Sequence, residues 1–263
     1  MKTLYKASII AIAVVVIVVA AYLFVQSSSL APFTKFGDMQ LSEGEVELLF
    51  LGTSTFIIRT SHHTIIIDTA TKVPADALKS LGIIDAILIT HEHSDHFDAS
   101  ATFNLHHASE AVVVANEGAY QSLEGLIHGP GKLIQLRPGE NAKIDGIVIN
   151  AIASNHSAIS PLMYVISMDN ITILHGSDSG FDPALEEYRG KIDIALLPTG
   201  DGSPTASPSQ AFKMAEAVLP KEVIPMHGTS TEYDELGSLL TTYLPGVKFV
   251  EVQTSSPQII SVP

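Results

Sequence analysis

Cysteine is absent from this chain of 263 residues. Without thiols the protein forms no disulfide bond and offers no thiolate to a metal ion. The absence is compatible with either an oxidising or a reducing compartment. Any bound metal ion must therefore be held by histidine and carboxylate side chains, and the chain has 11 His and 28 Asp or Glu.

Basic residues are scarce, with 14 Lys and Arg against 28 acidic residues and a formal charge of −14. Lys2 and Lys6 precede the first hydrophobic segment, so the part from Gln26 onward has 12 basic and 28 acidic residues, or −16. Such a surface repels phosphate backbones, and the sequence shows no local basic patch that would offset this. We therefore expect no nucleic-acid partner.

Internal repeats of fixed period are also absent. The composition is 46% hydrophobic, with 18 Gly and 14 Pro, and this is typical of a well-cored globular protein rather than a disordered one. The length is enough for one sizeable core. The sequence carries no indication of an oligomeric state.

A single long hydrophobic run stands near the N-terminus. Ala7–Val25 is almost entirely aliphatic, and no charged residue occurs between Lys6 and Lys35. As a helix the run would be about 28 Å long, close to the thickness of a bilayer's hydrocarbon core. It predicts a transmembrane anchor in residues 1–26, a linker in residues 27–44 and a globular domain in residues 45–263.

A cleaved signal peptide is the alternative interpretation of this run. Signal peptides usually have a hydrophobic region of about 7–15 residues followed by a small-x-small cleavage site. Here the run is longer, and the one candidate site, residues 29–31, is followed by Pro32. Two lysines before the run favour a cytoplasmic N-terminus. We therefore expect a single-pass membrane protein whose globular domain is extracytoplasmic.

The most informative motif is Thr90-His91-Glu92-His93-Ser94-Asp95-His96, directly after the apolar run at residues 83–89. It predicts a strand that ends in a loop of metal ligands, because neutral imidazoles and carboxylates are the donors that borderline divalent metals take. Alternating side chains could not all reach one ion. The spacing suits His91 and His93 on one ion and Asp95 and His96 on a second, with Glu92 and Ser94 pointing away. A chance surface cluster of histidines is the alternative.

This motif resembles the signature of the metallo-β-lactamase superfamily. The surrounding sequence, from about Val46 to about Ile260, is similar to a branch of small metal-dependent hydrolases that includes ascorbate-phosphate lactonase-like proteins. The resemblance implies an α/β fold, a four-layer αββα sandwich, here preceded by the N-terminal transmembrane helix. The pattern of strands, then mixed strands and helices, repeated in a second half, also fits two sheets faced by helices.

The resemblance further implies two divalent ions and, matched residue by residue, seven ligands. These are His91, His93 and His156 for the first ion, Asp95, His96 and His227 for the second, and Asp178 as a bridge between them. The last three single ligands each follow a predicted strand. Asp95 and Asp178 are also the acids expected to take the proton released from water. The histidine-rich ligands favour Zn²⁺, and the carboxylates leave Mn²⁺ or Fe open.

For several further residues the sequence gives only a weak indication of a role. Asp68 matches a residue that supports the ligand loop in the superfamily, although a plain turn acid is the alternative. His175 matches a residue that is not a ligand, and we expect it either to pack in the core or to support the ligands from behind. Asp201 lies in a loop similar to one that lines the cleft, with a simple Gly/Asp turn as the alternative. His62 and His63 are expected to be exposed in a hairpin turn.

The predicted activity follows from the expected ligands. Two adjacent cations lower the pKa of a shared water toward about 7, so that a hydroxide nucleophile exists at neutral pH. We expect a membrane-anchored enzyme that hydrolyses an ester, lactone or phosphoester of a small molecule. A nuclease or phosphodiesterase of the same superfamily is one alternative, and a metal-dependent binding module without turnover is the other.

Overall fold

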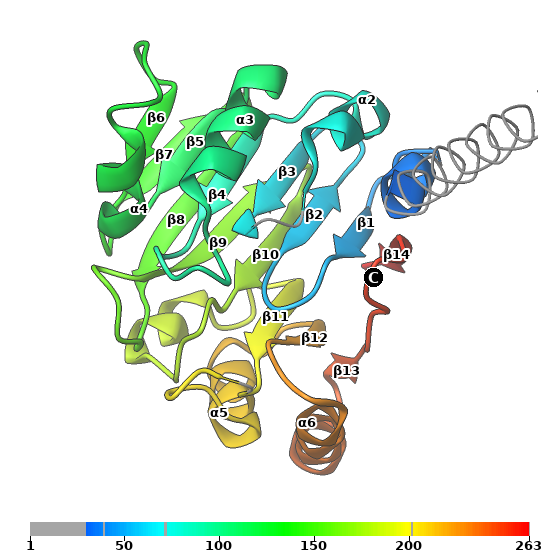
Figure 1. Ribbon diagram of the computed structural model, residues 1–263. Helices are drawn as coiled ribbons and strands as arrows, with labels where there is room; N and C mark the ends of the chain where they lie inside the picture. The colour runs from blue at the N-terminus through cyan, green and yellow to red at the C-terminus, as the bar shows by residue number, and fades with distance from the viewer. Residues whose placement is uncertain (1–29, 39, 71–72, 201, 263) are drawn as a thin grey trace, which may run out of the picture.

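The computed structural model describes residues 30–38, 40–70, 73–200 and 202–262. Two β-sheets face each other, and helices cover the outer face of each (Figure 1). In the described part of the chain each sheet has seven strands. The first sheet has the order β14 (Gln258–Ser261), β1 (Glu45–Phe50), β2 (Phe56–Arg59), β3 (Thr64–Ile67), β4 (Ala86–Ile89), β5 (Val112–Ala115) and β6 (Leu133–Gln135). The second has the order β13 (Lys248–Phe249), β12 (Glu222–Met226), β11 (Ile194–Pro198), β10 (Ile171–His175), β9 (Leu162–Met168), β8 (Ile147–Ala153) and β7 (Asn141–Ile144).

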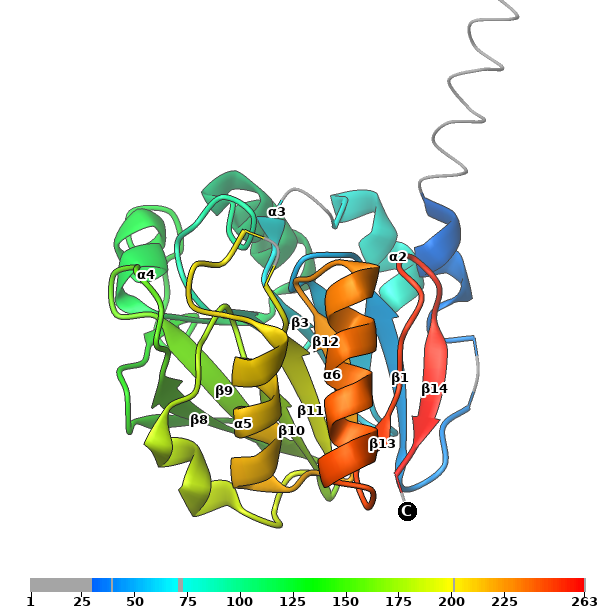
Figure 2. The ribbon, with the colours of Figure 1, turned by 90° about the horizontal axis from the view of Figure 1, so that it is seen from below.

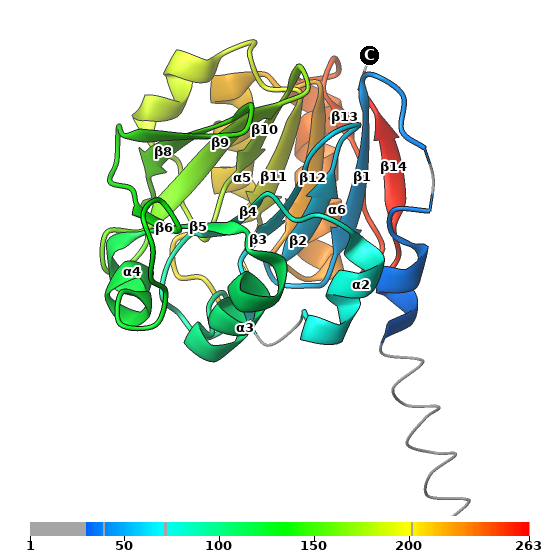
Figure 3. The same cartoon turned by 90° about the horizontal axis from the view of Figure 1, so that it is seen from above.

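The helices form two outer layers. Over the first sheet lie η2 (Ala75–Ala77), α2 (Leu78–Leu81), α3 (Ala99–Ser109) and α4 (Glu117–Leu123), as Figure 3 shows. Over the second lie η3 (Pro183–Tyr188), α5 (Pro208–Val218) and α6 (Ser230–Tyr243), with α5 and α6 side by side (Figure 2).

Strand side chains alternate between two buried environments. In β4, Ala86 and Leu88 join the core between the two sheets, whereas Ile87 and Ile89 face the helices over the first sheet. Both faces are therefore apolar, which explains why the central strands are continuous hydrophobic runs instead of alternating with polar residues.

Side-chain caps fix where the helices begin. The Asp98 carboxylate accepts the N–H of Ala101 at 2.7 Å, and the Ser207 hydroxyl accepts the N–H of Gln210 at 3.2 Å. Thr229 and Glu232 form a reciprocal capping box at the start of α6. Each cap satisfies a backbone N–H that has no partner within its helix. These caps set the first residues of α3, α5 and α6.

The prediction of a membrane helix before the sandwich is corrected by the structure. Across the ranges that the structure describes, no helix is both long enough and apolar enough to cross a bilayer. The described residues 30–35 are helical, and Phe33 within them and Phe36 just after them are buried in the core. The predicted anchor in residues 1–26 lies outside the described residues. The same finding corrects the predicted localisation, a single-pass membrane protein with an extracytoplasmic domain.

Strand direction brings the loops that carry the candidate ligands to one edge. β8 and β10 are both antiparallel to β9, and β10, β11 and β12 are parallel. β8, β10 and β12 therefore run in the same direction, and the loops that follow them emerge at the same end of the second sheet. His156, Asp178 and His227 lie in these three loops.

Candidate metal centre

The structure brings all seven predicted ligands together in two adjacent groups. Within the part of the chain that is described, the donor atoms of each group lie within 4.8 Å of one another. The first group is His91, His93 and His156, and the second is Asp95, His96, Asp178 and His227. His91 and His93 fall in one group and Asp95 and His96 in the other, which is the division that the spacing of the loop suggested.

The Asp178 carboxylate lies between the two groups. Its Oδ1 is 2.9 Å from His96 Nε2, and its Oδ2 is 3.2 Å from His227 Nε2. The same Oδ2 lies 3.9 Å from His156 Nε2 in the first group. Asp178 thus faces ligands of both groups, as a bridging carboxylate must.

Unpaired donor atoms test whether a metal fits here. His91 Nε2, His96 Nε2, His227 Nε2 and Asp178 Oδ1 are buried, and none of them forms a well-directed hydrogen bond among the described residues. His96 Nε2 and His227 Nε2 meet the Asp178 and Asp95 carboxylates only as ion pairs. A buried polar atom without a hydrogen bond costs free energy, so four such atoms aimed at one place require an explanation. Divalent ions bound by imidazole and carboxylate donors would satisfy all four, and the residues present fit such ions.

Without a bound ion, the charges in the second group balance each other. Burial alone would lower the pKa of His96, but Asp68 and Asp178 raise it to about 10. Burial likewise opposes the charge on His227, while Asp178 and Asp95 raise its pKa to about 9. The hydrogen bond from His227 in turn lowers the pKa of Asp95 to about 2. Two imidazolium ions thus face two carboxylates, a site that a cation can enter by displacing protons.

The first group has the opposite character. Burial, together with the neighbouring His96, lowers the pKa of His91 to about 3. Burial also lowers the pKa of His156. Both imidazoles are therefore neutral at pH 7 and ready to donate a lone pair to a metal ion.

Residues behind the ligands fix their orientation. Asp68 Oδ2 lies 2.7 Å from His96 Nδ1, and Asp68 Oδ1 accepts the N–H of Thr90 at 2.9 Å. The hydroxyl of Ser54 lies 2.8 Å from both Asp68 Oδ2 and His96 Nδ1. Asp68 therefore supports the ligand loop, as the resemblance implied, and the plain turn acid is excluded. Nothing in the local sequence marks Ser54 for this place.

Backbone strain is found at three positions around the centre. Asp68, Ser177 and His227 have φ of +54°, +54° and +47°, in the left-handed region that residues with a Cβ rarely adopt. At His227 the contacts on both sides hold the conformation, because its N–H donates to Thr53 O and its carbonyl accepts the N–H of Gly200, both at 2.9 Å. The turn at His227 directs the ring toward Asp178.

The remaining residues that the sequence singled out agree with their predictions only in part. His175 is fully buried and lies outside both ligand groups, with Nε2 3.0 Å from Ser54 O. Asp201 lies outside the described residues. His62 is exposed as expected, but His63 is not: its side chain is 15% exposed and its Nε2 lies 2.7 Å from Asp145 O. The hairpin turn packs against the Asp145 turn, which the sequence did not indicate.

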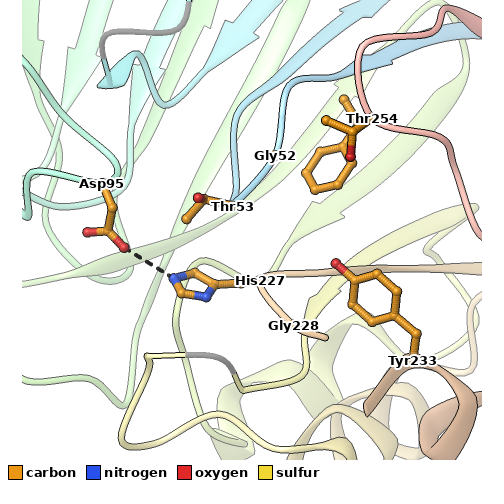
Figure 4. A pocket seen from close by; sticks show the side chains of 8 residues that line it. Gly52, Thr53, Asp95, His227, Gly228, Tyr233 and Thr254 are labelled. Atoms are coloured by element: carbon orange, nitrogen blue, oxygen red, sulfur yellow. Dashed lines mark ion pairs between the residues drawn. The ribbon is translucent and has the colours of Figure 1, made fainter. Parts of the chain in front are cut away.

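A cavity of about 210 Å³ opens beside the second group. Figure 4 shows Thr53, Asp95 and His227 beside it, with Tyr233 and Thr254 on the far side. The hydroxyl-bearing residues and Asp95 make the cavity polar. Among the described residues that line it, none is Lys or Arg.

Comparison with known proteins adds to this geometry. Residues 47–227 match the family model described as the β-lactamase superfamily domain. A UPF0173 protein of Pyrococcus furiosus is 30% identical over 191 residues, which cover 72% of this chain and 87% of that protein. A UPF0173 metal-dependent hydrolase of Thermococcus kodakarensis is 30% identical over 197 residues, which cover 69% and 84%. Among solved structures, the metallo hydrolase Igni18 of Ignicoccus hospitalis has a TM-score of 0.69 at 21% identity, covering 82% of this chain and 98% of that one.

Proposed function

Because the chain belongs to the metallo-β-lactamase superfamily and is a metal-dependent hydrolase of it, we propose that it holds two divalent ions and hydrolyses an ester, lactone or phosphoester of a small molecule. The observation that carries the proposal is the position of Asp178, which faces His96, His227 and His156 at once. A carboxylate shared by two ligand groups supports a pair of ions rather than two unrelated sites.

The donors support a proposal about the metals. Three imidazoles in the first group favour Zn²⁺, which nitrogen ligands bind well. Asp95 and Asp178 bring harder oxygen donors to the second group, so Mn²⁺ or Fe also fits there. When bound, such ions supply a nucleophilic water at neutral pH and polarise the bond to be cleaved.

The protein residues have distinct roles in this proposal. Asp178 is buried, and its carboxylate faces His96 and His227 of the second group and His156 of the first, so it holds the two groups together. The Asp95 side chain is 51% exposed and lines the cavity. Asp95 is therefore better placed to take a proton from water and pass it to the solvent. Asp178 is the other candidate.

The cavity supports a small substrate. A volume of about 210 Å³ admits a small polar group beside His227, and the lining hydroxyls of Thr53, Tyr233 and Thr254 offer hydrogen bonds. The absence of Lys and Arg from its described lining, together with the acidic sequence, disfavours a nucleic-acid substrate.

An activity screen on the full-length, metal-loaded protein tests the proposal. The substrates are p-nitrophenyl acetate, a simple lactone, a thioester and bis-p-nitrophenyl phosphate. We expect turnover of at least one class, and we expect His91→Ala and Asp178→Ala to lower its rate at least about 100-fold. His107→Ala, on α3 and outside both ligand groups, is the control. Equal rates for Asp178→Ala and the wild-type protein would contradict the proposal.

A further inference from the structure

Glu92 lies within the ligand loop but outside both ligand groups. Its carboxylate oxygens both accept hydrogen bonds from outside the loop. Oε1 accepts the backbone N–H of Ile159 at 2.7 Å, and Oε2 accepts from Asn116 Nδ2 at 3.0 Å. The side chain thus joins the ligand loop to the start of α4 and to the loop that carries His156.

Asn116 completes this junction. It is fully buried, and its Oδ1 accepts the N–H of Ala119 at 3.1 Å as the N-cap of α4. Its Nδ2 also donates to the carbonyl of Ile159 at 2.8 Å. Glu92 and Asn116 therefore hold the N–H and the C=O of the same residue.

Packing alone does not hold Ile159 in place. The residue is 48% exposed, which is unusual for a large hydrophobic side chain in this structure. A half-exposed side chain gains little stabilisation from burial, so the position of such a loop residue is fixed mainly by its hydrogen bonds. Hydrogen bonds to Glu92 and Asn116 are the ones that hold Ile159.

Gly118 makes room for the carboxylate. A Cβ at this position would collide with Glu92 Oε2. Glycine is otherwise unfavourable within a helix, because it gains no side-chain contact and loses more backbone entropy than alanine. A glycine in the first turn of α4 therefore fits a need for close approach to Glu92.

His156 lies only three residues before Ile159. Its Nε2 is 3.1 Å from His93 Nδ1. On its other side the loop is tied to the loop that carries Asp178, since the N–H of Asn155 donates to Ser179 Oγ at 2.7 Å. We propose that Glu92 is a positioning residue that holds the His156 loop against the ligand loop and so assembles the first metal site.

This inference rests on the proposed two-metal function and refines it. It assigns to Glu92 an effect on one site only, because the contacts of Asp95, His96 and His227 do not pass through Glu92 or Ile159. The first site should lose affinity when Glu92 is changed, and the second should keep it.

Zn²⁺ binding to full-length protein tests the inference. Chelator competition should show two tightly held ions in the wild-type protein and a loss of about 10–100-fold in affinity at one site in Glu92→Ala, with the other unchanged. Glu92→Gln should lie between them, because an amide has one acceptor oxygen where the carboxylate has two. Glu117→Ala, the neighbouring acid on α4, is the matched control and should bind as the wild-type protein does.

Gly118→Ala tests the same junction with Glu92 left in place. Alanine normally favours a helix over glycine, so a first-site affinity that falls about ten-fold points to the displaced carboxylate. Gly125→Ala is the control, since nothing lies within 4 Å of a Cβ there.

The possible outcomes separate the two proposals. A wild-type protein that binds fewer than two Zn²⁺ ions would contradict the proposed function itself. If the wild-type protein binds two and Glu92→Ala binds both with unchanged affinity, the role of Glu92 is wrong. Equal loss at both sites, or a metal-free Glu92→Gln variant that no longer unfolds cooperatively, would assign Glu92 to general stability and would also overturn the inference.

Discussion

The Asp68 carboxylate lies 2.7 Å from Nδ1 of His96, and both side chains are fully buried. The contact makes Nδ1 the hydrogen-bond donor and leaves Nε2 to face Asp178. A second partner of this kind fixes the tautomer and the orientation of a metal-bound ring.

We expect Asp68→Asn to lower metal affinity at the second site by about 10–100-fold, because an amide cannot hold the His96 ring as a carboxylate does. The first site should change much less. Chelator competition measures both affinities. Asp85→Asn is a suitable control, since Asp85 also accepts a backbone N–H, from Thr64, but lies at the opposite end of β4.

Metal binding at the second site should release about two protons at pH 7. His96 and His227, with pKa values of about 10 and about 9 before metal binding, are then protonated and must become neutral to act as ligands. Affinity at this site should therefore rise with pH up to about pH 9. His91, with a pKa of about 3, is already neutral at pH 7, so it should release no proton when it binds a metal ion.

Titration calorimetry in buffers of different ionisation enthalpy measures the protons released. A heat of binding that is the same in all buffers would contradict this prediction.

The Asp169 carboxylate should make stability depend on pH far from the metal centre. Burial opposes its charge, but hydrogen bonds from the Thr60 hydroxyl, the His62 N–H and the His63 ring lower its pKa to about 2. A lowered carboxyl pKa adds stability above the unfolded value of about 3.9, and that stability is lost as the pH falls toward 2. The free energy of unfolding of Asp169→Asn should thus fall below that of the wild-type protein at pH 5 and approach it near pH 2.

The contribution of His63 to stability depends on pH in the opposite direction. Burial lowers its pKa, but the Asp145 carbonyl and Asp169 outweigh burial and raise it above 6.5. Its contribution is present below about pH 6.5 and is lost as the pH rises through the folded-state pKa. Chemical denaturation of wild-type and Asp169→Asn protein between pH 2 and 9 measures both effects, and a constant difference across that range would exclude them. Asp234→Asn, at an exposed position on α6, is the control.

Tyr233→Phe should weaken substrate binding without changing the metal content. The substitution removes one hydroxyl from the cavity, and a lost hydrogen bond of about 0.5–1.5 kcal/mol corresponds to a KM about 2–10-fold higher. The rate at saturation should change less, because Tyr233 lies in neither ligand group. Tyr243→Phe, 66% exposed at the end of α6, is the control. Unchanged KM for every accepted substrate would remove Tyr233 from the binding site.

The sequence predicted the parts of this protein that depend on local rules. The start of α5 follows such a rule, since Ser207 supplies a capping hydroxyl and Pro208 a proline at the first turn, and both are features of the local chain. The ligand loop was equally visible, because its donors lie within six residues. The three distant ligands were found only through their family match, since no local pattern distinguishes His156 or His227 from other histidines.

What the sequence did not indicate depends on contacts between distant segments. β6 and β7 are only three and four residues long, and they pair because β5 and β8 lie beside them. Glu92 was predicted to point away from the metals, but its partners Asn116 and Ile159 lie 24 and 67 residues further along the chain. The helical residues before Phe36 also pack onto the sandwich through contacts with distant segments of the chain.

The number of metal ions per chain tests the central claim most directly. Full-length protein purified after metal-replete expression should contain close to two divalent ions per chain by elemental analysis, and His91→Ala and His227→Ala should each lose about one. A value near zero in the wild-type protein would show that the seven converging side chains do not form a metal centre.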